Sequence, residues 1–427
     1  MTGRPGFAAL ASARFRLYLA GQLVSLSGSW LQQIATSWLV YRLTGSSAAV
    51  GATLLLAQLP VFVLGSLAGV AGDRFDRQRL LIATQVAGGL QALLLGLAVA
   101  AGKATLPLLL GFSAVLGLVN ALDTPLRQSL VPSLVDRRED IRNAVALNSA
   151  CLHLARFIGA AAAALLLTRF DETSCFLVNA ASYAASLGAL LAIGPTGNPS
   201  VQGSSGRSLA DGLRYCSGHP QIRAVLLLIA ASSLIVVPYP TLLPAAIRGA
   251  TALDAGFYAR LMSCAGAGSI GAALVLARWH SDRALLLGMP LSLALAGAAV
   301  GGLGLGISSW PSWAAIVAVG LAGFALTIVI SGSNAFIQHH VPDQLRGRVM
   351  GLFTVSFNGL MPIGSLVLGT VADAAGTRAT LEIMGALALL IAAGSTASAY
   401  RRPPLSPGPG VRASGPDDSR TRCDPPG

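Results

Sequence analysis

Apolar residues run along most of the chain in long stretches, and polar residues gather in the short segments between them. A stretch of about 20 apolar residues can cross a bilayer core of roughly 30 Å as an α-helix, and a helix satisfies its own backbone hydrogen bonds in lipid. The sequence therefore predicts an all-α membrane protein with twelve transmembrane helices. Their expected ranges are 15–41, 48–72, 78–101, 105–126, 142–167, 173–194, 221–246, 254–277, 284–306, 311–336, 346–372 and 377–399.

A segment rich in Gly, Ser and Pro separates the first six predicted spans from the last six and is typical of a linker. The segments after the fourth and tenth spans share a Val-Pro pair, at Val131 and Val341, followed by an arginine. This similarity favours a duplicated unit and two pseudo-symmetric six-helix bundles. The expected division is a cytoplasmic arm at 1–14, bundles at 15–194 and 221–399, a cytoplasmic linker at 195–220 and a disordered cytoplasmic tail at 400–427.

Composition excludes a water-soluble fold, because 54% of the residues are hydrophobic and 11% are charged, against about a quarter charged in average soluble proteins. The net charge of +12 could indicate nucleic acid. The basic residues lie in short connectors, however, without the continuous stripe that nucleic acid requires, so no nucleic-acid partner is expected. Most of the 29 Lys and Arg residues fall on one side if the N-terminus is inside. We therefore expect a multi-pass protein of the cell membrane with both termini cytoplasmic.

Enzymatic and metal-binding signals are weak. The five cysteines form no C-x-x-C pair, and His339-His340 lacks a third ligand. No glycine-rich phosphate loop and no arrangement of residues suited to hydrolysis is present. We expect a protein that is not an enzyme, with no cofactor and no metal, whose energy comes from an ion gradient.

The loop after the second span combines Gly69, Asp73, Arg74 and Arg77 within nine residues. Asp73 could accept hydrogen bonds from the N-terminus of a neighbouring helix, and Arg77 could pair with a carboxylate on another span. A loop that only sets the topology is the simpler interpretation.

The spacing of these four residues resembles the G-x-x-x-D-[RK]-x-G-[RK]-[RK] loop of the major facilitator superfamily. Asp76 stands where that pattern usually has Gly, and the resulting D-R-x-D-R resembles the branch that includes siderophore (enterobactin-type) and macrolide exporters. Segments at 120–128 and 179–183 extend the resemblance over residues 10–400.

This resemblance implies the major facilitator fold and a secondary active transporter, a monomer in the lipid bilayer that works by alternating access. It would export a small hydrophobic or amphipathic molecule (drug, antibiotic or siderophore) by proton antiport. The loop would form a cytoplasmic gate by contacting the fourth and eleventh spans. A proton-coupled nutrient importer and a membrane receptor or assembly partner that no longer transports are the alternatives.

Ionisable side chains within spans are functional candidates because burial in lipid costs several kcal/mol. Arg156 in the fifth span could bind an anionic or carbonyl-rich substrate or pair with a carboxylate. Asp123 could accept a proton, pair with Arg127 four residues on, or bind Arg77 in the gate, which the resemblance favours. Further candidates for substrate or coupling are Gln32, Gln33, Asn148, Asn334, Asn358 and Glu382, although amides more often tie helices together.

Overall fold

The computed structural model describes the backbone of residues 8–74, 76–194, 209–248, 254–279, 281–306 and 311–400. Within these ranges, the side chains of residues 65–74, 138, 142, 209–211, 343 and 398–400 lie outside the description. The described residues form helices joined by short connectors, which confirms the predicted all-α class.

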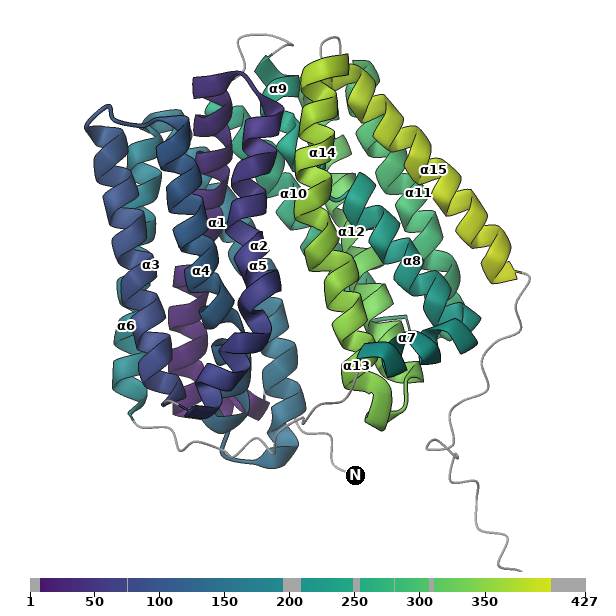
Figure 1. Ribbon diagram of the computed structural model, residues 1–427, viewed down its shortest axis with the longest axis horizontal. Helices are drawn as coiled ribbons and strands as arrows, with labels where there is room; N and C mark the ends of the chain where they lie inside the picture. The colour runs from purple at the N-terminus through teal and green to yellow at the C-terminus, as the bar shows by residue number, and fades with distance from the viewer. Residues whose placement is uncertain are drawn as a thin grey trace, which may run out of the picture.

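The first bundle holds the helices coloured purple to blue in Figure 1. They are α1 (Ala13–Thr44), α2 (Ser47–Arg74), α3 (Arg77–Ala100), α4 (Leu106–Leu130), α5 (Ile141–Arg169) and α6 (Glu172–Ile193), with short turns at Ala8–Ala11, Val131–Leu134 and Arg138–Asp140. Each helix overlaps one predicted span.

The second bundle holds the teal to yellow helices of Figure 1. They are α7 (Leu209–Gly218), α8 (Pro220–Ile235), η4 (Tyr239–Thr241), α9 (Leu243–Arg248), α10 (Ala255–Leu276), α11 (Asp282–Gly306), α12 (Ser312–His340), α13 (Asp343–Thr354), η5 (Val355–Gly359), α14 (Leu360–Ala375) and α15 (Thr377–Tyr400). Helix α7 lies within the expected linker and packs beside α13; composition alone did not predict it.

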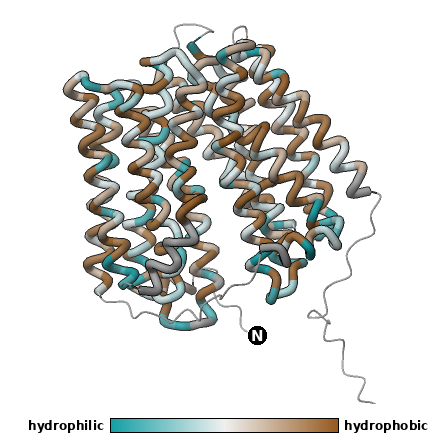
Figure 2. The backbone as a smooth tube through the Cα atoms, viewed as in Figure 1, coloured by the Kyte–Doolittle hydropathy of each residue, from teal (hydrophilic) through white to brown (hydrophobic). Residues whose placement is uncertain are grey.

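Eleven helical segments of the described residues are long and apolar enough to cross a membrane. Helix α1 is a continuous helix of 32 residues, but it contains several glutamines and serines and is not among the eleven. The predicted number of twelve spans therefore remains a prediction, and it depends on α1. Figure 2 shows apolar residues along the middle of the helices and hydrophilic residues mostly near their ends.

Two spans of the second bundle are irregular where the sequence contains proline and glycine. Helix α8 ends at Ile235, and the chain passes through Pro238 and Pro240 before α9 begins, because proline lacks a backbone donor and clashes with the preceding turn. The other span contains a π-helical turn, η5, directly before α14. Such turns leave backbone groups free of the regular ladder and are frequent at functional sites.

The two bundles touch where small residues let the backbones approach closely. Helix α2 packs on α14, and α5 packs on α10. A Cβ atom at Gly369 would lie 2.5 Å from the Ser47 carbonyl oxygen, and one at Gly266 would lie 2.9 Å from the Phe157 Cα. Glycine is therefore required for these close contacts between helices.

Candidate functional site

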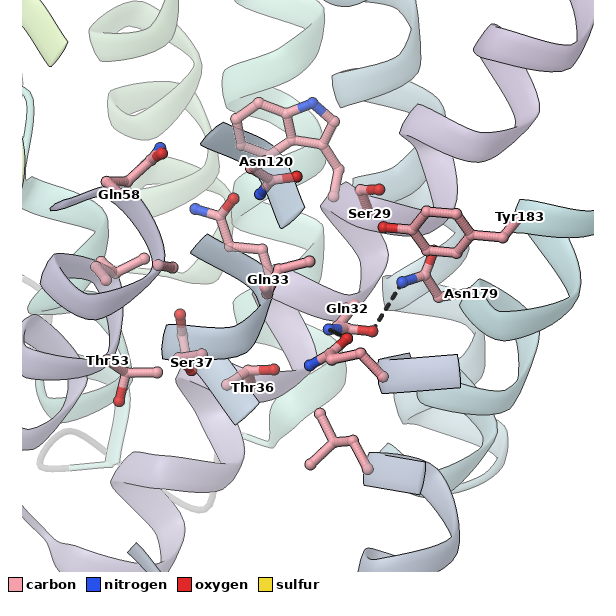
Figure 3. A pocket seen from close by; sticks show the side chains of 17 residues that line it. Ser29, Gln32, Gln33, Thr36, Ser37, Thr53, Gln58, Asn120, Asn179 and Tyr183 are labelled. Atoms are coloured by element: carbon pink, nitrogen blue, oxygen red, sulfur yellow. Dashed lines mark hydrogen bonds between the residues drawn. The ribbon is translucent and has the colours of Figure 1, made fainter. Parts of the chain in front are cut away.

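A cavity lies within the first bundle, among α1, α2, α3, α4 and α6, with an empty volume of about 800 Å³ that is partly open to solvent. This volume includes open solvent, and the enclosed space that water could fill is about 120 Å³. Figure 3 shows its wall, on which amide and hydroxyl groups alternate with apolar side chains. The polar lining residues are Ser29, Gln32, Gln33, Thr36, Ser37, Thr53, Gln58, Gln91, Ser113, Asn120, Asn179 and Tyr183. The lining contains no acidic or basic side chain among the described residues.

Three amides from three helices lie on one side of this cavity: Gln33 of α1, Gln58 of α2 and Asn120 of α4 (Figure 3). All three are partly exposed, and none has a hydrogen-bond partner within the described part of the chain. Because each amide offers both a donor and an acceptor, they can bind a ligand that has hydrogen-bonding groups of either kind.

Gln32, the neighbour of Gln33, is tied into the bundle instead. Its Nε2 donates to Gln91 Oε1 at 3.2 Å, and its Oε1 accepts from Asn179 Nδ2 at 2.7 Å. The network joins α1, α3 and α6, and Gln91 also donates to the Phe112 carbonyl of α4. Gln32 therefore ties helices together, while Gln33 remains available to a ligand.

A buried ion pair lies one helical turn beyond the cavity on α4. Asp123 Oδ2 accepts from Arg127 Nε at 2.6 Å, and the two side chains are 13% and 8% exposed. Asp123 Oδ1 accepts from Thr84 at 2.8 Å and also from Gln85 of α3. Gln85 in turn accepts from Arg127 Nη2 at 2.8 Å. The structure thus places Asp123 in the i,i+4 pair with Arg127, and α3 completes its coordination.

The expected cytoplasmic gate is only partly visible. The side chains of Gly69, Asp73 and Arg74 lie outside the described residues, so their role remains a prediction. Arg77 is the first residue of α3, and its side chain is buried. Asp76 caps α3 by accepting from the Arg79 amide at 2.9 Å. A carboxylate at a helix N-terminus satisfies free backbone donors.

Arg156 lies beside the cavity, with its guanidinium 4.9 Å from the ring centroid of Trp30. Trp30 also lines the cavity. Asn148, on the same helix, has a buried Oδ1 without a hydrogen-bond partner in the described residues. Both positions therefore keep polar groups that the described protein does not satisfy.

The remaining candidates lie away from the cavity. Asn334 accepts from Gln338 on its own helix α12, and Asn358 is exposed on η5. Glu382 pairs with Arg378 at 2.9 Å near the start of α15. The structure does not bring these three residues together with the amides of the first bundle.

One contact between the bundles was not predicted from the sequence. Asp373, at the end of α14, accepts hydrogen bonds at the start of α2: from the Ser47 amide at 2.7 Å, the Ala48 amide at 3.1 Å and the Ser46 hydroxyl at 2.5 Å. The signal was present, because Gly369 and Asp373 repeat the G-x-x-x-D spacing of Gly69 and Asp73.

Comparison with known proteins identifies the family. Residues 4–404 match the family described as transmembrane secretion effector. The chain belongs to this family of major facilitator transporters. It is similar to the staphyloferrin A transporter of Staphylococcus aureus (26% identity, 87% of this chain and 92% of that one). It is also similar to the multidrug efflux pump Tap of Mycolicibacterium fortuitum (24% identity, 88% and 93%).

Solved structures agree on the fold of this family member. The chain superposes on the nucleoside transporter NupG with a TM-score of 0.70 at 12% identity, covering 92% of this chain and 100% of that one. At this identity the likeness speaks for the major facilitator fold alone. Together with the family match, it makes the chain an integral membrane transporter, and the predicted resemblance is confirmed.

Proposed function

We propose that this transporter exports a small amphipathic or hydrophobic molecule, such as a drug, an antibiotic or a siderophore, from the cytoplasm by proton antiport. The observation that carries the proposal is a cavity inside one bundle where three amides have no partner among the described residues, next to a buried carboxylate. The relatives named for staphyloferrin A transport and multidrug efflux support a small organic substrate. The chain would act in the cell membrane, as a monomer, with both termini cytoplasmic.

Alternating access would come from rocking of the two bundles. The contacts of Asp373 with the start of α2, and the stacking of Trp38 on Tyr258 at 6.0 Å between centroids, join the bundles at one end. With a cytoplasmic N-terminus, α2 starts on the outer side, so these contacts would close the outer entrance. A cavity closed to the outside accepts its substrate from the cytoplasm, as an exporter requires.

In the opposite state the cytoplasmic side would close. Gly69, Asp73, Arg74 and Arg77 would then form a gate between the bundles, supported by the Asp123–Arg127 pair at the inner end of α4. A carboxylate that binds a helix N-terminus and an arginine that binds a carboxylate release their partners when the bundles separate. The outer end of the α2 and α14 pair would thus be closed in one state, and its cytoplasmic end would be closed in the other.

Proton coupling is assigned to Asp123. Protonation of this carboxylate would remove the charge that holds Arg127 and would release Gln85. Since Asn120 lies one turn away on α4, a shift of this helix end would reach the substrate cavity. The coupling and the gate therefore share the same residues.

The test uses everted membrane vesicles that carry an internal pH-sensitive dye and an imposed acidic interior. Addition of a transported antibiotic or siderophore from a panel should raise the internal pH, because a proton antiporter moves protons out of the vesicle as it carries substrate in. Asp123→Asn and Asp73→Asn should abolish the response, while Asp136→Asn, an exposed loop acid, should leave it intact.

Acidification on addition of substrate would indicate an importer instead. Normal transport by Asp73→Asn would refute the gate, and normal transport by Asp123→Asn would refute the assigned coupling.

A further inference from the structure

Arg156 is a charged residue in a membrane-spanning helix that lacks a counter-ion among the described residues. An arginine within the bilayer is costly, so such residues normally pair with an acid. Arg156 contacts the Trp30 ring and lies within electrostatic range of His153 and Tyr239. None of these groups is a carboxylate. Contact with an aromatic face attracts the cation but does not neutralise it.

Close packing of helix α5 on both sides of Arg156 fixes the position of this residue. Gly159, one turn further along α5, lies against α1, and a Cβ atom there would be 2.7 Å from the Trp30 Cβ. The neighbouring Phe157 packs on Gly266 of α10 in the second bundle. Arg156 therefore lies at the junction of the two bundles and next to a residue of the cavity wall.

Tyr239 brings a second unsatisfied group to this junction from the opposite bundle. Its side chain is 2% exposed, and its hydroxyl has no hydrogen-bond partner within the described residues. Tyr239 interacts electrostatically with Arg156, and it lies in η4, where the span is broken. The hydroxyls of Ser233 and Thr241, on either side of the break, are also buried without partners. Buried polar groups are rarely left unpaired unless a ligand or a functional role accounts for them.

We propose that Arg156 and Tyr239 form a carboxylate-binding site between the two bundles, and that the transported molecule carries a carboxylate. This inference rests on the proposed transport function. The planar guanidinium can donate two parallel hydrogen bonds to a carboxylate, the Tyr239 hydroxyl can donate a third, and Trp30 can contact apolar carbon next to the charged group. The neutral amides of the cavity would bind the rest of the molecule. Because no acidic side chain among the described residues lines the cavity, a cationic group gains no partner there.

Substrate that binds both residues would also bridge the bundles. Arg156 belongs to the first bundle and Tyr239 to the second, so a carboxylate between them contributes binding energy only when the bundles are close together at this level. Binding and bundle closure would thus be linked through differential affinity for two states.

A pair of probes of the same shape tests this site without any ion gradient. Benzoate and benzamide are titrated into the purified full-length protein in detergent, with quenching of tryptophan fluorescence as the signal. Benzoate should bind saturably and more tightly than benzamide. Arg156→Gln should weaken benzoate by about tenfold or more, the effect expected for hydrogen bonds to charged groups, and should leave benzamide unchanged.

Matched variants keep the test independent of folding. Arg169→Gln removes the same charge from an exposed position at the end of the same helix and should leave benzoate binding unaltered. Tyr239→Phe removes only one hydroxyl and should weaken benzoate a few-fold while sparing benzamide. Arg156→Lys should retain part of the affinity, because it keeps the charge and loses the bidentate geometry.

The proposal would be overturned by the absence of saturable benzoate binding, by equal affinity for benzoate and benzamide, or by unchanged benzoate binding by Arg156→Gln. Phenylphosphonate that binds more tightly than benzoate would contradict the carboxylate assignment as well. Failure of the transport function is distinguishable, since benzoate binding would then persist while everted vesicles move no substrate. Conversely, vesicles of Arg156→Gln that export normally would refute this site and leave the transporter intact.

Discussion

Both bundles bury hydroxyl side chains, but the first bundle also buries amides and charged groups. Among the described residues, the first bundle buries amides and charged side chains beside its hydroxyls: Gln22, Gln32, Arg77, Gln85, Gln91, Arg127, Glu172 and Asn179. The second buries almost only hydroxyls: Ser232, Ser233, Thr241, Ser269, Ser292, Thr327, Ser333, Ser365 and Thr380, with Gln221 as the exception. The hydroxyls of Ser232, Ser269 and Thr327 donate to carbonyls four residues earlier on their own helices.

This difference indicates that the two bundles have different roles in transport. An amide or an ion pair needs partners on other helices, so it fixes the positions of several helices relative to one another. A hydroxyl that donates to its own backbone makes no such demand, and apolar packing then holds the bundle together. We therefore expect ligand and proton chemistry to lie mainly in the first bundle, with the second bundle moving as its apolar counterpart.

The largest expected effect is the loss of the buried ion pair. Asp123→Ala leaves the Arg127 charge buried without its partner and should destabilise the protein by roughly 3–5 kcal/mol. Thermal unfolding of the purified protein in detergent measures the change. The second bundle offers a control, because Asp282→Asn breaks the pair with His340, where Asp282 is 44% exposed, and should cost less than about 1 kcal/mol. Equal losses for the two variants would remove the contrast between the bundles.

The adjacent glutamines of α1 should separate stability from transport. Gln32→Leu removes the hydrogen-bond partner of Gln91 Oε1 and of Asn179 Nδ2 and should cost about 1–3 kcal/mol. Gln33→Leu should leave thermal unfolding unchanged and raise the KM for the exported compound about tenfold, because a ligand hydrogen bond is lost. Ser269→Ala in the second bundle should change neither quantity by much. A reversed pattern for the two glutamines would mean that the cavity is not the substrate site.

Much of this arrangement follows from the sequence, and the limits are physical. Apolar runs placed the spans because lipid demands long helices, and the break after α8 lies at two prolines, Pro238 and Pro240. The sequence cannot decide between Gln32 and Gln33, because one residue along a helix rotates a side chain by about 100°, and only packing determines which one faces the cavity. The contacts of Asp123 with α3, and those of α2 with α14, join residues that lie far apart in the sequence. The sequence alone therefore does not reveal them.

A smaller effect should follow from weakening the contact between the bundles. Asp373→Asn removes the charge that binds the start of α2, and such interactions are worth about 0.3–1 kcal/mol at exposed sites. Hydrogen exchange at the Ser47 and Ala48 amides, measured by mass spectrometry, should therefore speed up by about two- to fivefold. Asp254→Asn, which alters the cap of α10 instead, should leave these amides unaffected. Unchanged exchange in Asp373→Asn would show that the contact does not hold the bundles together.

The smallest effect concerns Asp171, which begins α6 of the first bundle. Its carboxylate accepts from the Ser174 amide and hydroxyl, each at 3.0 Å, and these hydrogen bonds lower the pKa of Asp171 below its ordinary value of 3.8. A lowered pKa stabilises the folded state above the ordinary value, and this contribution disappears as the pH falls below it. Because the group is mostly exposed, the contribution should stay under about 1 kcal/mol.

Unfolding midpoints of wild type and Asp171→Asn, compared between pH 6 and pH 3, measure this contribution. The difference between the two proteins should be present at pH 6 and should narrow toward pH 3. A difference between the two unfolding midpoints that grows as the pH falls would contradict the expected direction of the pH dependence.

Helix α1 runs without interruption from Ala13 to Thr44, and only Gly45 and Ser46 separate it from α2. Gly45 adopts a φ of +66°, which makes so tight a reversal possible. The same stiff rod therefore carries Gln33 at its middle and ends beside the residues that Asp373 holds. A movement of that helix end would tilt α1 as a rigid body, so an opening at one membrane face would displace Gln33 in the cavity without any relay of side chains.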